Sequence, residues 1–185
     1  RGLGDVYKRQ FVGSVTDRKN PKIIIESLET IDGDVSLEII GQTPNLKYLK
    51  ELNNLISSSK YSERITMTPF IESEQLISKY ASANLFILPS KSEGLGRVVI
   101  EAQATACPVL VSSNTGMVDL IIENETGYIF ENNNKNDLSN KIQYIMNNYE
   151  SALQTGLNSK NFIKENQSVA NFEFGYKKLI DLVSI

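Results

Sequence analysis

The sequence contains no histidine and no tryptophan. Without histidine, the chain has no histidine general base, no histidine partner for a nucleophile and no histidine metal ligand. Without tryptophan, a carbohydrate-binding platform would have to use tyrosine or phenylalanine. The single cysteine, Cys107, excludes a disulfide framework and agrees with a reducing compartment.

Positive charge is also scarce, with 19 Lys and Arg residues against 22 Asp and Glu residues and a formal net charge of −3. A nucleic-acid-binding domain would show a basic surplus, so we expect no nucleic-acid partner. No apolar run approaches the length needed to cross a membrane. We therefore expect the cytoplasm as the location, with peripheral attachment at the inner face of the membrane as an open alternative.

The 185 residues, of which 41% are hydrophobic, correspond to about one soluble domain with a sizeable core. Residues 1–10, RGLGDVYKRQ, do not match the rest of the chain, because they lack an initial Met and place Lys8, Arg9 and Gln10 where a buried strand should begin. We interpret them as a non-native junction and exclude them from the fold. We expect residues 11–185 to form a single α/β domain that belongs to a longer protein.

Short apolar runs alternate with amphipathic segments along the rest of the chain. Hydrophobic periodicity and turn residues predict one strand ending at Val12 and others at 35–40, 65–70, 85–88, 109–111 and 127–130. Helices are predicted at 21–31, 46–55, 73–80, 97–105, 117–122, 137–145, 151–165 and 168–183, with Asn20, Ser73 and Asn136 as capping residues. Continuous apolar strands in such an alternation predict a Rossmann-like, doubly wound six-stranded parallel sheet with helices on both faces.

The stretch PSKSEGLGRVVIEAQATACP, residues 89–108, gives the clearest chemical signal. Glu93 precedes Gly94 and Gly96, which would let a ligand approach the backbone, and a predicted helix N-terminus comes next, which would attract an anion. Glu101 lies in that helix among apolar and small residues, so we expect it to be buried and to need a hydrogen-bond partner. A nucleotide-sugar, which combines phosphates with hydroxyl groups, would fit both features. On spacing alone, a second interpretation is equally good: Glu93 is a solvated acid of a loop, and Glu101 is a residue at the surface edge of a helix.

The same stretch resembles the signature of retaining glycosyltransferases of the GT-B fold, in the large family-4 group, usually written E-G-x-G…E-A…P-V. The resemblance also includes FVGSVTDRKNP, LEIIGQTP and ENETGYIF, and it extends from Phe11 to about Val183. It implies the C-terminal, donor-binding half of a two-domain enzyme. Such an enzyme would transfer a hexose, with retention, from a UDP-sugar or GDP-sugar to an acceptor glycan or lipid-linked glycan held by a missing N-terminal domain.

The resemblance also implies roles for residues at matching positions. Glu93 would contact the donor sugar, and Lys19 would neutralise the diphosphate leaving group, which makes these two the catalytic candidates. Glu101 would bind the ribose. The remaining donor-binding candidates are the diphosphate-holding residues Gly94, Leu95, Gly96 and Arg97, the loop residues Gly13, Ser14 and Arg18, and the base-holding residues Gly41, Gln42, Phe70 and Ile71. The resemblance implies no metal and no cofactor.

Some positions depart from the family pattern. Ser14 stands where the family commonly has Arg, so one cation that would pair with the diphosphate is missing unless Arg18 or Arg97 substitutes for it. Thr43 replaces a glycine of the turn after the second strand. A second hypothesis is therefore a non-catalytic module that binds a nucleotide-sugar or a partner protein. A third, a dinucleotide-binding oxidoreductase, fits poorly because GSVTDR lacks the G-x-G-x-x-G pattern and the second strand ends without a ribose-binding acid.

Overall fold

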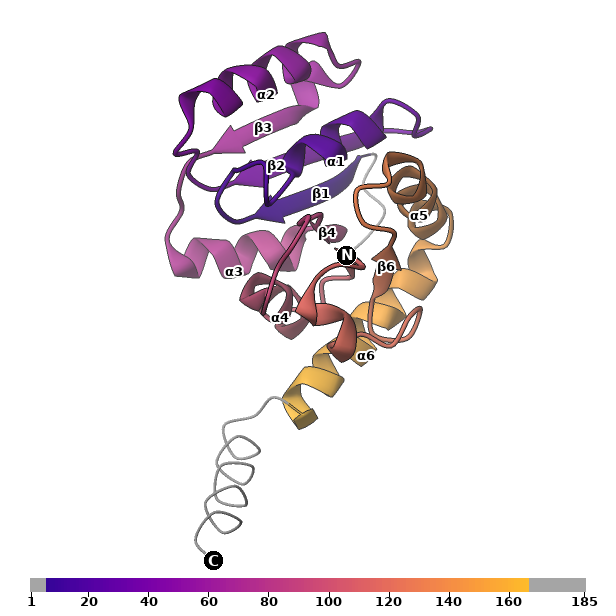
Figure 1. Ribbon diagram of the computed structural model, residues 1–185. Coiled ribbons are helices and arrows are strands. Elements are labelled where there is room, and N and C mark those ends of the chain that lie inside the picture. The colour runs from indigo at the N-terminus through magenta and orange to yellow at the C-terminus, as the bar shows by residue number, and fades with distance from the viewer. Residues whose placement is uncertain (1–5, 167–185) are drawn as a thin grey trace, which may run out of the picture.

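The computed structural model describes residues 6–166, which form one parallel β-sheet between layers of helices (Figure 1). The strands are β1 (Tyr7–Val12), β2 (Val35–Ile40), β3 (Ile65–Thr68), β4 (Leu85–Leu88), β5 (Val109–Ser112) and β6 (Tyr128–Phe130). Their order across the sheet is β3-β2-β1-β4-β5-β6, and every neighbouring pair is parallel. The predicted doubly wound, six-stranded Rossmann-like sheet is confirmed.

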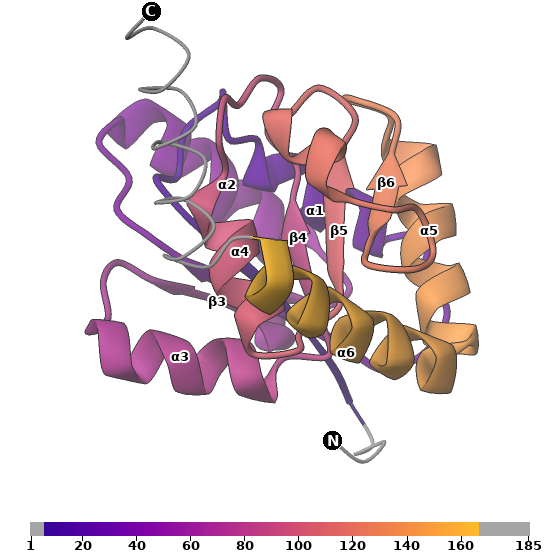
Figure 2. The same ribbon diagram turned by 90° about the horizontal axis from the view of Figure 1, so that it is seen from below.

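Helices cover both faces of this sheet, as the sequence predicts. One face carries α1 (Pro21–Leu28), α2 (Leu46–Ser58) and α5 (Lys135–Asn147), and the other carries α3 (Ser73–Ser82), α4 (Arg97–Ala104) and the short 3-10 helix η2 (Gly116–Leu120). A second 3-10 helix, η1 (Ser62–Arg64), precedes β3. The last described helix, α6 (Tyr149–Asn166), contacts α5 at its start and then α4 (Figure 2). Two apolar cores result, one on each side of the sheet.

The starts of α5 and α3 differ from the predicted caps. The cap of α5 is Asn134, whose side chain accepts hydrogen bonds from the backbone of Asn136 and Asp137, so the assignment of this role to Asn136 is wrong. Ser73 is the first residue of α3 and comes after the cap position, which Glu72 occupies. A short polar run offers several cap residues, and only the chain path selects one of them. The helix predicted at 168–183 lies outside the described residues.

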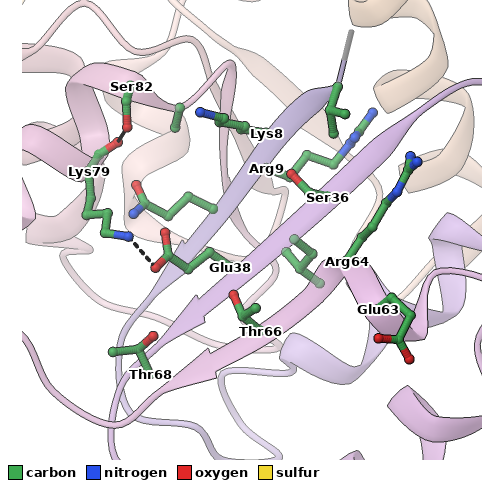
Figure 3. Close-up of a pocket in the computed structure, with 14 residues that line it drawn as sticks. Lys8, Arg9, Ser36, Glu38, Glu63, Arg64, Thr66, Thr68, Lys79 and Ser82 are labelled. Atoms are coloured by element: carbon green, nitrogen blue, oxygen red, sulfur yellow. Dashed lines mark hydrogen bonds and ion pairs between the residues drawn. The ribbon is translucent and has the colours of Figure 1, made fainter. Parts of the chain in front are cut away.

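One side of β1–β3 is polar, which contradicts the expectation of continuous apolar strands. Side chains of Ser36, Glu38, Thr66 and Thr68 line an open cavity of about 620 Å³ beside α3 (Figure 3). Lys79 of α3 donates to Glu38 at 2.7 Å across this cavity. Val12 and Ile40, at the ends of β1 and β2, pack in the core that includes Tyr80 of α3, whereas Ser36 and Glu38, earlier in β2, are only partly buried.

The first strand begins earlier than the sequence suggests. β1 pairs with β2 from Tyr7↔Val35 to Val12↔Ile40, so the exclusion of residues 7–10 from the fold is wrong. Backbone pairing along six residues outweighs the unfavourable side chains of this segment. The interpretation of residues 1–10 as non-native stays a prediction.

Arg9 is an unusual residue for the middle of a core, since it is only 2% exposed. Its guanidinium donates to the Tyr7 carbonyl at 3.1 Å and to the Met146 sulfur, while its Nε has no hydrogen-bond partner among the described residues. Burial lowers the pKa of Arg9 to about 9. A buried guanidinium in such surroundings opposes folding.

We therefore expect Arg9→Leu to raise the free energy of unfolding at pH 7 by about 1–4 kcal/mol, the range seen when buried charges give way to apolar groups. The folded-state pKa of Arg9 lies below its unfolded value. The unfolded state therefore binds more protons above pH 9, and the unmodified protein should gain stability relative to Arg9→Leu as the pH rises. Denaturant titrations at pH 7 and 9.5 would measure both effects. Lys8→Leu, at the exposed neighbouring position, is the control and should show no such pH-dependent difference.

Candidate functional site

Two loops meet at the carboxyl ends of the adjacent central strands. Residues 13–20 connect β1 to α1, residues 89–96 connect β4 to α4, and the strand order reverses between β1 and β4. Such a reversal is where open α/β sheets bind their ligands, because the loops on its two sides diverge. The loops bring the predicted catalytic residues together: the Lys19 ammonium forms an ion pair with Oε2 of Glu93, and Nη1 of Arg18 lies 3.6 Å from the same oxygen.

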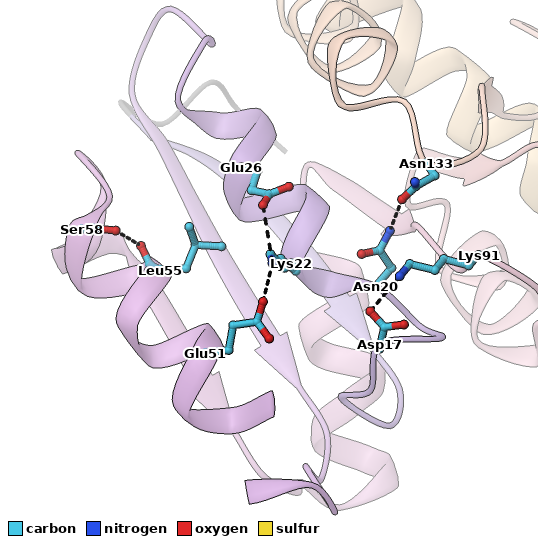
Figure 4. Close-up of polar contacts among 9 residues, drawn as sticks. All are labelled: Asp17, Asn20, Lys22, Glu26, Glu51, Leu55, Ser58, Lys91 and Asn133. Carbon is cyan, nitrogen blue, oxygen red and sulfur yellow. Dashed lines mark hydrogen bonds and ion pairs between the residues drawn. The ribbon is translucent and has the colours of Figure 1, made fainter. Parts of the chain in front are cut away.

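Backbone and side-chain bonds join these loops along their length. The backbone N–H of Lys91 donates to the Arg18 carbonyl at 2.9 Å, and the Arg18 guanidinium donates to the Ser92 carbonyl at 2.8 Å. The Lys91 ammonium pairs with Asp17 at 2.7 Å (Figure 4). Asn114, from the loop after β5, donates to the Lys91 carbonyl at 2.6 Å. The position of Glu93 relative to Lys19 is thus set by several contacts besides their own ion pair.

The helix that begins just after Lys19 is held from both sides. Lys22 of α1 pairs with Glu51 of α2, and the Asn20 side chain donates to Asn133 of the β6–α5 loop at 3.3 Å (Figure 4). Asn20 occupies the N-cap position of α1 and Pro21 follows it, as predicted, but Asn20 has a left-handed backbone, with φ of 53°, and its side chain makes no cap hydrogen bond. Asparagine tolerates this conformation better than most residues, which allows the chain to turn sharply into α1.

The segment after β5 contacts the backbone of Glu93. Glu93 pairs in parallel with Thr115, and the Gly116 N–H donates to the Glu93 carbonyl at 2.9 Å. A Cβ atom at residue 116 would lie 2.1 Å from the Gly94 carbonyl oxygen, so this close approach requires glycine. Sequence reasoning missed this support, although a glycine after a predicted strand was a possible signal.

The helix α4 is less buried than predicted. Val99, Ala102 and Gln103 face the interior, whereas Arg97 and Glu101 are exposed, so the expectation of a buried Glu101 is wrong. Only one side of α4 packs against the sheet, because α3 and α6 flank it. Glu101 does have a protein partner, the Tyr80 hydroxyl, which donates to its Oε2 at 3.1 Å. Glu93 and Glu101 therefore have different partners in this structure.

The predicted glycines of the β4–α4 loop have different surroundings. A Cβ atom at Gly94 would meet no atom within 4 Å, so the backbone is open on that side, while its carbonyl lies against Gly116. A Cβ atom at Gly96 would lie 2.8 Å from the Leu88 side chain, so that glycine serves packing. Leu95 between them is 59% exposed.

A second hollow lies beside the loop after β2. A cavity of about 450 Å³ includes Gly41 and Gln42 among its walls, in agreement with their predicted position at the sheet edge. Its other lining residues, which sequence reasoning missed, are Thr43, Pro44, Leu49, Met67 and Pro69. Phe70 is 63% exposed and Ile71 packs partly into the second core, and neither of them lines this cavity.

Ser14 is exposed and Gly13 has a φ of 146° on the β1–α1 loop. Within residues 6–166, no group of three or more Cys, Asp or Glu side chains is arranged to hold a metal ion. In the same range, no helix is both long and apolar enough to cross a bilayer.

The comparison with protein families decides the assignment. The model of the family described as glycosyl transferases group 1 matches residues 6–162. The chain belongs to this family. An uncharacterized glycosyltransferase of Methanocaldococcus jannaschii is 30% identical over 162 residues, which are 88% of this chain and 44% of that protein. The capsular polysaccharide biosynthesis glycosyltransferase CapM of Staphylococcus aureus is 31% identical over 78% of this chain and 38% of that protein.

Solved glycosyltransferases share the fold. The Anabaena protein HepE, crystallised with UDP and glucose, has a TM-score of 0.87 at 18% identity, over 98% of this chain and 49% of that one. The C-terminal domain of a group 1 glycosyl transferase from Francisella tularensis has a TM-score of 0.81 at 21% identity, over 88% of this chain and 87% of that domain. The fold is thus that of the Rossmann-like C-terminal domain of GT-B glycosyltransferases, and this chain spans less than half the length of the first relatives.

The geometry at Gly41 predicts that replacing this glycine with alanine lowers the stability of this group 1 glycosyltransferase chain. Gly41 has a φ of 150°, and a Cβ atom there would lie 1.8 Å from the Gly13 carbonyl oxygen. Gly41→Ala should cost about 1–3 kcal/mol through the strained backbone alone, which corresponds to a loss of about 2–4 °C in Tm for each kcal/mol. Gly94→Ala is the matched control, because its surroundings are open. Equal melting temperatures for the two variants would contradict this account of the close approach.

Proposed function

We propose that this chain is the donor-binding part of a retaining hexosyltransferase. It would bind a nucleoside-diphosphate sugar and transfer its hexose to an acceptor glycan or lipid-linked glycan that a separate domain holds. The observation that carries the proposal is the convergence of Arg18, Lys19 and Glu93 at the carboxyl ends of β1 and β4. Cations there suit a diphosphate, and a carboxylate suits sugar hydroxyls.

The charges suit the chemistry of glycosyl transfer. In that reaction the bond between the anomeric carbon and the phosphate oxygen breaks, and the diphosphate leaves with the electron pair. The anomeric carbon bonds to the acceptor oxygen, and the acceptor proton is released. Lys19, with a side chain 14% exposed, lies where desolvation would strengthen its attraction to the charge that develops on the leaving group. Arg18 is 57% exposed and would add a weaker contribution.

The relatives support a nucleotide donor. The Anabaena structure of the same fold holds UDP and glucose, and a Mycolicibacterium smegmatis relative, 24% identical, is named a GDP-mannose-dependent mannosyltransferase. The cavity beside Gly41 and Gln42 is where the base would be held. Glu93 and Lys19 would act in catalysis, and Gly94 would let the diphosphate approach the backbone.

Calorimetric titration with UDP, GDP and their sugars tests the proposal. Lys19→Met should weaken binding of the nucleotide and of its sugar alike, by about 10- to 100-fold, since a hydrogen bond to a charged group contributes about 1.5–3 kcal/mol. Glu93→Gln should weaken binding of the sugar nucleotide more than that of the nucleotide alone, because only the sugar would contact Glu93.

Lys22→Met is the matched control for Lys19→Met. Lys22 lies three residues farther along the chain and pairs with Glu51 on α2, away from Glu93. Melting temperatures would show whether each variant is folded. Absence of saturable binding to any of these nucleotides, or equal binding by the unmodified chain and Lys19→Met, would refute the proposal.

Ser14 favours a second candidate, a non-catalytic module that binds a nucleotide-sugar or a partner protein. The residue is exposed on the β1–α1 loop and carries no charge where the resemblance leads us to expect Arg. Under the first proposal, Ser14→Arg adds a diphosphate cation and tightens UDP or GDP binding. Glycosyl transfer by a protein in which this chain is joined to an acceptor-binding domain would exclude the module.

A further inference from the structure

Glu101 is exposed on α4, yet one of its oxygens is already engaged. The Tyr80 hydroxyl of α3 donates to Oε2 of Glu101 at 3.1 Å. A glutamate on an exposed helix surface ordinarily samples several rotamers. A ligand that binds only one of them loses binding free energy, because the side chain gives up its rotamer freedom. The contact through Oε2 restricts the carboxylate before any ligand arrives.

The tyrosine itself is held firmly. Tyr80 is 1% exposed and belongs to the core formed by α3, α4 and the sheet. Its ring lies edge-on to Phe86 of β4, with centroids 5.5 Å apart and an angle of 75° between the planes. Because the ring is packed, the core sets the position of its hydroxyl oxygen beside Glu101.

The protonation state of Tyr80 fits this role. Burial, followed by the nearby Glu101 carboxylate, raises the pKa of Tyr80 far above its ordinary value. The hydroxyl therefore remains protonated, and able to donate, throughout the neutral range.

We propose that Tyr80 is a positioning residue that orients the Glu101 carboxylate to accept hydrogen bonds from the ribose hydroxyls of a bound nucleoside diphosphate. The inference rests on the proposed function, because it needs a nucleotide at this edge of the sheet. It adds a residue of another helix, 21 positions earlier in the chain, to the recognition of that nucleotide. The rival explanation is that the bond only ties α3 to α4.

Tyr80→Phe distinguishes the two explanations, because it removes the hydroxyl and keeps the ring. The dissociation constants of UDP and GDP would be measured by calorimetry and compared with those of their 2′,3′-dideoxy analogues. If Tyr80 orients Glu101, binding of the natural nucleotide that the chain prefers should weaken by about 3- to 10-fold, the effect of one hydrogen bond. Binding of the dideoxy analogue should change less than about 2-fold, because it lacks the hydroxyls that Glu101 would bind.

Tyr128→Phe is the matched control. Tyr128 is 2% exposed, and its hydroxyl contacts Thr155 at 3.2 Å, on β6 and α6. This variant should lose stability as Tyr80→Phe does and bind both nucleotides normally. A Glu101→Gln variant completes a cycle with Tyr80→Phe: if the tyrosine acts through Glu101, the double variant should bind no worse than Glu101→Gln alone.

The outcomes separate the two proposals. Failure of the unmodified chain to bind UDP or GDP would overturn the proposed function and this inference with it. If the unmodified chain binds UDP or GDP, three results would overturn the positioning role alone. Tyr80→Phe could lose affinity equally for the natural and the dideoxy nucleotide, or it could lose no affinity. Its effect could also add fully to that of Glu101→Gln.

Discussion

The ion pair between Lys19 and Glu93 is the contact on which the arrangement of the candidate site depends. It joins the loops that come after β1 and β4, and both side chains are largely withdrawn from water, at 14% and 12% exposure. A charge in such a place is costly without its counter-ion, so each loop is stabilised by the other. Gly116 also donates a backbone hydrogen bond to Glu93, so the segment after β5 helps to hold this part of the candidate site in place.

The ion pair also shapes how the proposed donor would enter. Arg18 and Lys19 together offer two positive charges against the single carboxylate of Glu93. A diphosphate would compete with Glu93 for the Lys19 ammonium, and Glu93 would then be free to accept bonds from sugar hydroxyls. These three groups carry a net charge of +1, and the carboxylate between the two cations limits the cost of holding the cations close together. Binding would exchange one partner for another and leave few charges unpaired.

The strands were the most predictable part of the fold. β2 and β4 have the predicted bounds, because their apolar runs end at residues that break the pattern. The start of β1 could not be predicted, because pairing with β2 carries residues 7–10 into the sheet despite their polar side chains. The cap of α5 was misplaced by two residues, because Asn134 and Asn136 are equivalent in sequence and differ only in the path of the backbone.

The site was predictable in outline for a related reason. Parallel strands place their carboxyl ends at one edge, so the loops with Lys19 and Glu93 had to be near each other once the strand order was β1 beside β4. The partners of each side chain were not predictable, since Tyr80 and Glu101 meet only through the packing of α3 on α4. The structure also bears on the missing family Arg at position 14: Arg18 is anchored to the Ser92 carbonyl, and its guanidinium lies beside Glu93. We propose that Arg18, four positions farther along the same loop, takes the place of that cation.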